Sequence, residues 1–126
     1  MKRAALWFLI ALFSGAGVVH FTRSRGFEAI VPTWLPNARL LVAISGVAEI
    51  LGAIGLALAP TRSAAGWGLI ALLVAVFPAN IQMLLLARAT GASALWQAAL
   101  WARLPLQPVL VWMVWWVSIA GRGRAT

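Results

Sequence analysis

One carboxyl side chain lies in the middle of a long apolar stretch of this sequence. Glu49 is one of only 2 acidic residues in the chain, and it lies near the centre of the apolar run 40–59. A carboxyl group deep in a bilayer is costly, so it is usually paired, neutral or part of a site. Ser45 lies one turn before Glu49 and shares its helical face. We therefore take Glu49 as the centre of a candidate site for a ligand or a proton.

Polar side chains in the other apolar segments fall in the same half of the expected helices. His20 ends the first apolar run, Asn80 lies well inside the third, and Gln107 lies about one turn into the fourth. Arg103 precedes the fourth run, and its side chain is long enough to reach inward. We predict a polar pocket that opens towards loops carrying two tryptophans. Its predicted ligand-binding residues are His20, Trp34, Ser45, Glu49, Asn80, Trp101, Arg103 and Gln107.

Such a pocket suits a small amphipathic molecule with an apolar body and a polar head, such as a quinone or a lipid. In it, Glu49 and His20 would hydrogen-bond the head group and exchange protons, and Arg103 would stabilise developing negative charge. A structural interpretation stays open beside this one. Glu49 could instead pair with an arginine or histidine and hold helices in register, and Asn80 could join helices near the kink expected at Pro78.

The composition indicates an integral membrane protein. Of the 126 residues, 63% are hydrophobic and 10% are charged, whereas a soluble domain is about half apolar and about a quarter charged. The net charge is +8, but the arginines lie between apolar runs, where they fit membrane flanks and anionic headgroups better than nucleic acid. The sequence has no cysteine and one histidine, which excludes disulfides, thiolate metal sites and bis-His haem within one chain. We predict no metal site, no covalently bound cofactor and no catalytic residues.

Four apolar segments are long enough to cross a membrane as helices. They predict an all-α, membrane-embedded antiparallel four-helix bundle, formed as a single domain by residues 1–126. The first segment is nearer the length of a span than that of a secretory signal. The predicted spans are 4–21, 38–59, 64–87 and 104–120.

Two connections are less regular than the spans. After the first helix, Pro32 and Pro36 flank Trp34 and predict an interfacial or partly re-entrant loop with the indole at headgroup depth. Ser93 is a helix start signal, and Pro105 is compatible with the first turn of the last span. Residues 94–102 therefore form either a separate interfacial helix or a bent extension of that span.

The ends of the spans give a weak indication of orientation. Tryptophans fall at both ends, as expected for two aromatic belts. The basic residues divide equally between the two sides, so the positive-inside rule decides nothing. The free amino terminus on one side and Glu28 on the other favour cytoplasmic termini, in a bacterial inner (plasma) membrane.

Five short segments of the sequence together carry a resemblance to a known family. They are Gly17–Phe21, Ile30–Pro36, Ser45–Gly52, Phe77–Met83 and Arg103–Gln107. As an ordered set they resemble the DoxX-like family of small integral membrane proteins, and the resemblance implies a four-helix membrane protein. It also implies a link to membrane redox or stress chemistry, because the family is named after a subunit associated with a thiosulfate:quinone oxidoreductase. This chain has no cysteine or cofactor motif, so a bound quinone or a partner would have to carry electrons.

We expect a binding or accessory membrane protein that is not an enzyme by itself. Its expected partners are membrane lipid, a membrane redox protein or further copies of this chain. Two alternatives stay open. A structural or assembly subunit would use the polar residues only to hold the helices together. A small transporter would need a continuous polar path, which the apolar half of the spans nearest the termini does not offer within one chain.

Overall fold

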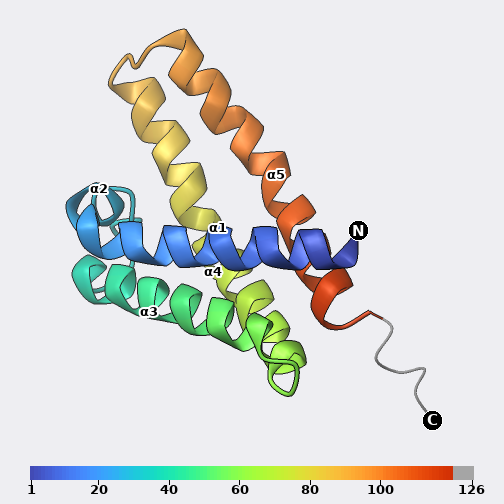
Figure 1. Cartoon of the computed structure of the whole chain (residues 1–126). Coiled ribbons are helices and arrows are strands. Elements are labelled where there is room, and N and C mark those ends of the chain that lie inside the picture. The colour runs from blue at the N-terminus through green and yellow to red at the C-terminus, as the bar shows by residue number, and fades with distance from the viewer. Residues whose placement is uncertain (121–126) are drawn as a thin grey trace.

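The computed structural model describes residues 1–120, and all regular structure in that part of the chain is helical. This confirms the predicted all-α class. The described residues form five helices, of which α2 is much shorter than the others (Figure 1). They are α1 (Lys2–Thr22), α2 (Ser24–Glu28), α3 (Ala38–Ala57), α4 (Arg62–Ala89) and α5 (Ala94–Ser118).

The long helices associate as two antiparallel pairs that cross each other. In Figure 1, α1 and α3 lie side by side with opposite directions, and α4 and α5 form the second pair. Contacts of α3 with α4 and of α1 with α5 join the pairs. The end of α4, the start of α5 and the turn between them extend away from α1 and α3 (Figure 1).

Side chains fix the ends of the long helices. Asn37, in the left-handed region at φ 48°, caps α3 by accepting a hydrogen bond from the Leu40 amide. Ser93 caps α5 in the same way through the Trp96 amide, as its position in the sequence predicts. At the other end of α3, the Arg62 guanidinium donates to the Leu56 carbonyl at 2.7 Å. Such bonds satisfy terminal backbone groups that the helices themselves leave unpaired.

Three helices of the described residues are long and apolar enough to cross a membrane, namely α1, α3 and α4. The fourth predicted span, 104–120, is not in this group. It belongs to α5, a single helix that starts at Ala94 and continues through Pro105 and Pro108. Residues 94–102 are thus an extension of the last helix, and the alternative of a separate interfacial helix is wrong. Pro105 lies inside the helix and not in its first turn.

The hydrophobic core is divided into two clusters by a polar layer. The first cluster joins all four long helices through Leu9, Phe13, Ala53, Leu56, Leu69, Leu73 and Val114. The second cluster, Leu84, Ala87 and Leu100, involves only α4 and α5. Asn80 lies between the two clusters along α4, and Gln107 lies between them along α5; both side chains are buried. Polar groups therefore occupy the level at which the two helix pairs separate.

Candidate functional site

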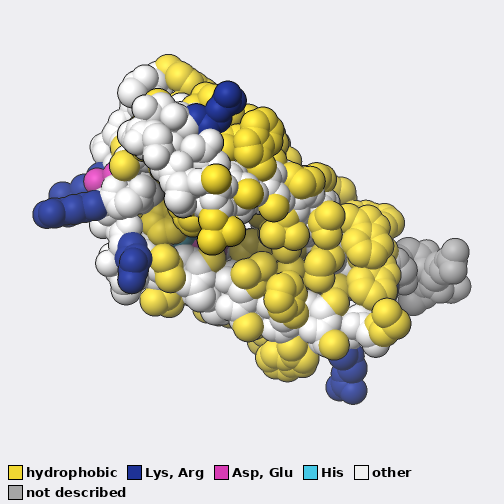
Figure 2. Space-filling model, turned by 90° about the horizontal axis from the view of Figure 1, so that it is seen from above, with side chains coloured by type: hydrophobic (Ala, Val, Ile, Leu, Met, Phe, Trp, Pro, Cys, Tyr) yellow, Lys and Arg dark blue, Asp and Glu magenta, His cyan; other side chains and the backbone are white. Residues whose placement is uncertain are grey.

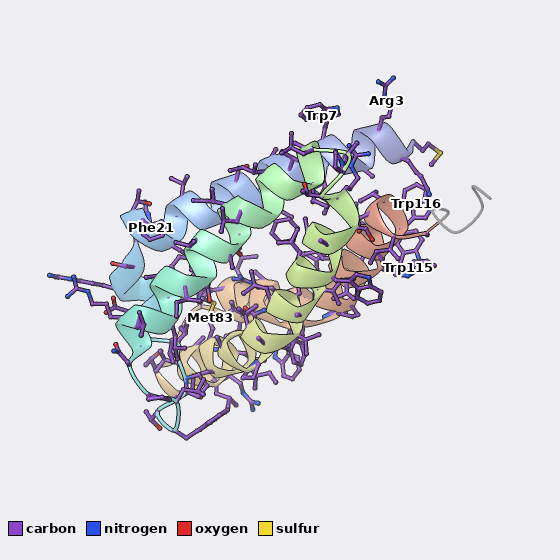
Figure 3. All side chains as sticks on the ribbon, turned by 90° about the horizontal axis from the view of Figure 1, so that it is seen from below. Arg3, Trp7, Phe21, Met83, Trp115 and Trp116 are labelled. Carbon is purple, nitrogen blue, oxygen red and sulfur yellow. The ribbon has the colours of Figure 1, made fainter. Side chains whose placement is uncertain are left out.

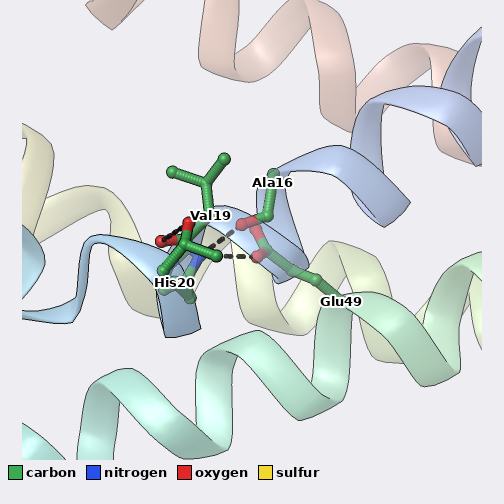
Figure 4. A network of polar contacts seen from close by, with 5 residues as sticks. Ala16, Val19, His20 and Glu49 are labelled. Atoms are coloured by element: carbon green, nitrogen blue, oxygen red, sulfur yellow. Dashed lines mark hydrogen bonds and ion pairs between the residues drawn. The ribbon is translucent and has the colours of Figure 1, made fainter.

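A close crossing of α1 and α3 brings the histidine to the half-buried glutamate. A Cβ atom on Gly17 would lie 2.9 Å from the Gly46 carbonyl oxygen, and one on Gly46 would lie 2.9 Å from the His20 Cβ. Only glycine allows the backbones to approach this closely. At the crossing, His20 Nδ1 lies 2.9 Å from Glu49 Oε2 (Figure 4). The two side chains are each 12% exposed, so the contact is largely shielded.

The histidine nitrogen at this contact faces two oxygens. Nδ1 lies 2.8 Å from the Ala16 carbonyl oxygen as well as 2.9 Å from Glu49 Oε2 (Figure 4). A carbonyl oxygen accepts only, so this nitrogen carries the hydrogen. The hydrogen is aligned with Ala16, because Glu49 Oε2 is a buried oxygen without a hydrogen bond in the described part of the chain. Glu49 therefore lies against the imidazole without a hydrogen bond to it, and its acceptor capacity is left over.

A cavity of about 280 Å³ begins at this pair and lies between α3 and α4. Its walls are mostly apolar. Ile44, Ala75 and Arg103 line it and are also exposed, so the cavity opens to the surface of the molecule there. Its polar lining residues are His20, Ser45, Glu49, Asn80 and Arg103.

The connection between α1 and α3 covers the end of the cavity. Phe27 of α2 stacks on the His20 ring with a centroid distance of 4.1 Å. Ile30 and Pro32, which follow, are buried and line the cavity together with Val31 and Leu35. The predicted interfacial loop is thus folded inward along one side. Trp34 in the same loop is 73% exposed and does not line the cavity.

Behind the cavity, two amides connect α4 to α5. The Asn80 side-chain amide donates to Gln107 Oε1, and Gln107 Nε2 donates to the Leu73 carbonyl oxygen. Pro78 has no amide hydrogen to donate to the Val74 carbonyl four residues earlier, and the Gln107 amide is found on the carbonyl one residue before that, at Leu73. Gln107 does not line the cavity, contrary to the predicted pocket. It supports the cavity from behind through its contact with Asn80.

Several polar groups of the cavity have no protein partner. No hydrogen bond within residues 1–120 uses the Ser45 hydroxyl or the side-chain oxygen Oδ1 of Asn80, although both residues line the cavity. Arg103 makes a long contact of 3.9 Å to the Met83 sulfur and no ion pair with a described residue. The cavity thus offers a hydroxyl, an amide oxygen, a carboxyl and a guanidinium to a guest molecule.

The family model described as "Domain of unknown function (DUF8561)" matches residues 9–118. The chain belongs to this family. No curated protein and no solved structure matches it. The range shared with the DUF8561 model contains every residue of the predicted site.

In this DUF8561 chain, five of the eight predicted site residues reach the cavity and three do not. Trp34 and Trp101 are exposed, and Gln107 lies behind Asn80. Depth along α5 does not determine which face of that helix turns towards the cavity, so Trp101 and Gln107 were misplaced; Trp34 lies in the connection between α2 and α3, where helical depth does not apply. The residues that the sequence analysis missed are those of the apolar cover, Phe27, Ile30 and Pro32. Their signal was an apolar segment too short to span, placed next to the polar helix end.

Proposed function

We propose that this chain is an integral membrane protein whose cavity binds a small amphipathic molecule, a quinone or a lipid, by its polar head. The observation that carries the proposal is the composition of the cavity lining. Apolar walls lead from the exposed rim at Ile44 and Ala75 to a polar end around Glu49, with unpartnered acceptors at Ser45 and Asn80. This arrangement matches a molecule with a hydrogen-bonding head and an apolar body.

Embedding in a bilayer is supported by the surface of the molecule. Every long helix exposes large apolar side chains, including Phe8, Ile54, Val74 and Trp112, each more than half exposed. Figure 2 shows hydrophobic side chains over most of one face, with lysine and arginine at its margins. In water, so much contiguous apolar surface would cause aggregation. We infer that α5 completes the membrane domain beside the three apolar helices.

The tryptophans near the termini fit a membrane interface. Trp7, Trp115 and Trp116 lie towards the same end of the molecule as Arg3, whereas Phe21 lies at the opposite end of α1 (Figure 3). Lys2 lies 5.5 Å from the centre of the Trp116 ring and donates to the Ala120 carbonyl. Indoles beside basic residues are typical of headgroup depth. We place the termini on the cytoplasmic side of a bacterial inner membrane.

The size of the cavity limits the guest. At about 280 Å³ it lies just below the usual range for ligand sites, roughly 300–1,000 Å³. It accepts a ring or a headgroup, while an isoprenoid or acyl tail leaves through the rim. The resemblance to DoxX-like proteins makes a quinone the first candidate. Electrons would then be exchanged with a partner, because no described side chain is a redox centre.

The experiment is to purify the protein in mild detergent, extract bound quinones and lipids, and quantify them by mass spectrometry. Ala75→Phe places a ring at the cavity rim, and Ala71→Phe adds the same ring one turn earlier on α4, outside the cavity. We expect a bound quinone or lipid to be retained by wild type and Ala71→Phe and lost from Ala75→Phe. Equal retention by all three proteins, or no bound molecule in any, would contradict the proposal.

A structural role is the alternative with some support. The contacts of His20 with Glu49 and of Asn80 with Gln107 each join two helices. If these contacts served assembly alone, substitutions at Glu49 would reduce stability without changing the retained molecules. Stability and ligand retention must therefore be measured on the same variants.

A further inference from the structure

His20 lines two separate hollows. The first is the cavity with Glu49. The second is a hollow of about 260 Å³, called here the outer cleft, between the end of α1, α2 and the start of α3. The outer cleft is lined by His20, Phe21, Ser24, Glu28, Arg39, Val42 and Ala43. Because Arg39 is exposed and Glu28 half-buried, this cleft is open to the aqueous end of the molecule.

The two nitrogens of the ring have different surroundings. Nδ1 lies against Glu49 and the Ala16 carbonyl. Nε2 makes no hydrogen bond with residues 1–120. In that range, Glu49 Oε2 is the side-chain polar atom that is both buried and without a hydrogen bond. Nε2 also lacks a hydrogen bond but is not buried in this way, so it keeps accessible surface. The imidazole is therefore in contact with the carboxyl on one side and accessible on another.

We propose that His20 transfers protons between the Glu49 carboxyl in the cavity and water in the outer cleft. In the inward direction, a hydronium ion in the outer cleft protonates Nε2 of the neutral imidazole, whose Nδ1 already carries a hydrogen, and the ring becomes an imidazolium. The imidazolium then passes its Nδ1 hydrogen to Glu49 Oε2, which becomes a neutral carboxyl, and the ring returns to a neutral form with its hydrogen on Nε2. The same steps in reverse carry a proton outward. Histidine suits this step because its two nitrogens bind and release protons near neutral pH. The route needs no ligand in the cavity, so it does not rest on the proposed function.

Charged groups on each neighbouring element favour exchange at this end. Glu49 and Arg39 approach His20 from α3, Glu28 from α2, and Arg103 from the rim of the cavity. Towards the termini, by contrast, the space beyond Glu49 is filled by the first core cluster, whose members are all apolar. The proposed route is therefore a branch from one side to the cavity, and not a channel across the molecule.

The composition of the chain makes the route measurable. Only 2 acidic residues and 1 histidine are present, so the infrared carbonyl band of protonated Glu49 is assigned by comparing wild type with Glu49→Gln and Glu28→Gln. In liposomes, a rapid pH change should alter this band at a rate set by proton access. His20→Gln keeps a hydrogen-bonding group but cannot be protonated. We expect this variant to slow the change by about tenfold or more.

A second variant tests the outer cleft with the histidine intact. Ala43→Phe fills the cleft, and Ala38→Phe adds the same ring to α3 at a half-buried position that lines neither hollow. We expect Ala43→Phe to slow the response as His20→Gln does, and Ala38→Phe to leave it at the wild-type rate. Circular dichroism and size-exclusion profiles check that each protein is folded. Equal rates in wild type, His20→Gln and Ala43→Phe would overturn the proposal, whether or not a quinone or lipid is bound.

Discussion

At the scale of single residues, Glu49 is a shielded carboxyl whose ionisable neighbour is His20. His20 contacts one of its oxygens without an aligned hydrogen, and Arg103 remains at the rim without an ion pair among the described residues. A group used only to join helices would be expected to use its hydrogen-bonding capacity fully. The capacity left over at Glu49 is what we assign to a guest molecule.

Substitution of Glu49 separates the functional from the structural interpretation. Glu49→Gln keeps the shape and a carbonyl oxygen but removes the charge. We expect the free energy of unfolding to change by less than about 1 kcal/mol, because polar contacts between membrane helices contribute about that much. The amount of retained quinone or lipid should fall by about tenfold, the equivalent of about 1.4 kcal/mol for one charge-assisted hydrogen bond. Unchanged retention combined with a large loss of stability would favour the structural interpretation.

At the scale of helices, the glycine crossing of α1 and α3 sets the geometry of the site. Gly17→Ala would put a Cβ 2.9 Å from the Gly46 carbonyl oxygen and 3.3 Å from the Glu49 Cβ. We expect it to force the helices apart and destabilise the protein by about 1–3 kcal/mol. Gly15→Ala is the matched control, since a Cβ there meets nothing within 4 Å; it should be neutral or stabilising by up to about 1 kcal/mol. Unfolding in detergent, followed by circular dichroism, would measure both, and equal effects would contradict the close crossing.

The amide pair between α4 and α5 makes a second prediction at this scale. Asn80→Leu or Gln107→Leu alone leaves the other buried amide unpaired, which costs about 1–3 kcal/mol. The double variant should cost less than the sum of the single variants, because both members of the contact are then apolar. A double-mutant cycle on the free energy of unfolding measures the coupling. Additive effects would show that the two amides do not depend on each other.

The sequence predicts some parts of this arrangement better than others. The rise of 1.5 Å per residue fixes depth, which is why His20, Ser45 and Glu49 could be expected in the same half of the bundle. It does not fix the fold of a connection, so Pro32 and Pro36 left both an interfacial and a partly re-entrant loop open, and the sequence does not say which side chains of residues 27–35 turn inward. The proline at 105 was taken for a helix start, but α5 continues through it, and the sequence alone does not say where a proline is tolerated inside a helix.

At the scale of the whole molecule, the two ends of the helix bundle should lie on opposite sides of the membrane. The lack of cysteine permits labelling of single introduced thiols. Pro60→Cys lies in the turn before α4, and Ala89→Cys lies at the end of α4; both positions are exposed. With cytoplasmic termini, a membrane-impermeant maleimide should label Ala89→Cys in intact cells and Pro60→Cys only after permeabilisation.

The labelling pattern has two informative failures. The reverse pattern would keep α4 as a span and invert the orientation. Labelling of both positions from the same side would contradict the membrane arrangement itself. A second thiol pair, at exposed positions of α1 and α5, would extend the same measurement to α5, which is not among the three helices that are long and apolar enough to span a membrane.

The most direct measurement is the electron density of crystals grown in a lipid phase that contains the quinone. We predict density for a non-protein head group inside the cavity, within hydrogen-bonding distance of Glu49 and of Ser45 or Asn80, with its tail leaving past Ile44 and Ala75. A cavity that holds water alone, or one closed by its own side chains, would contradict the binding site proposed for this family member.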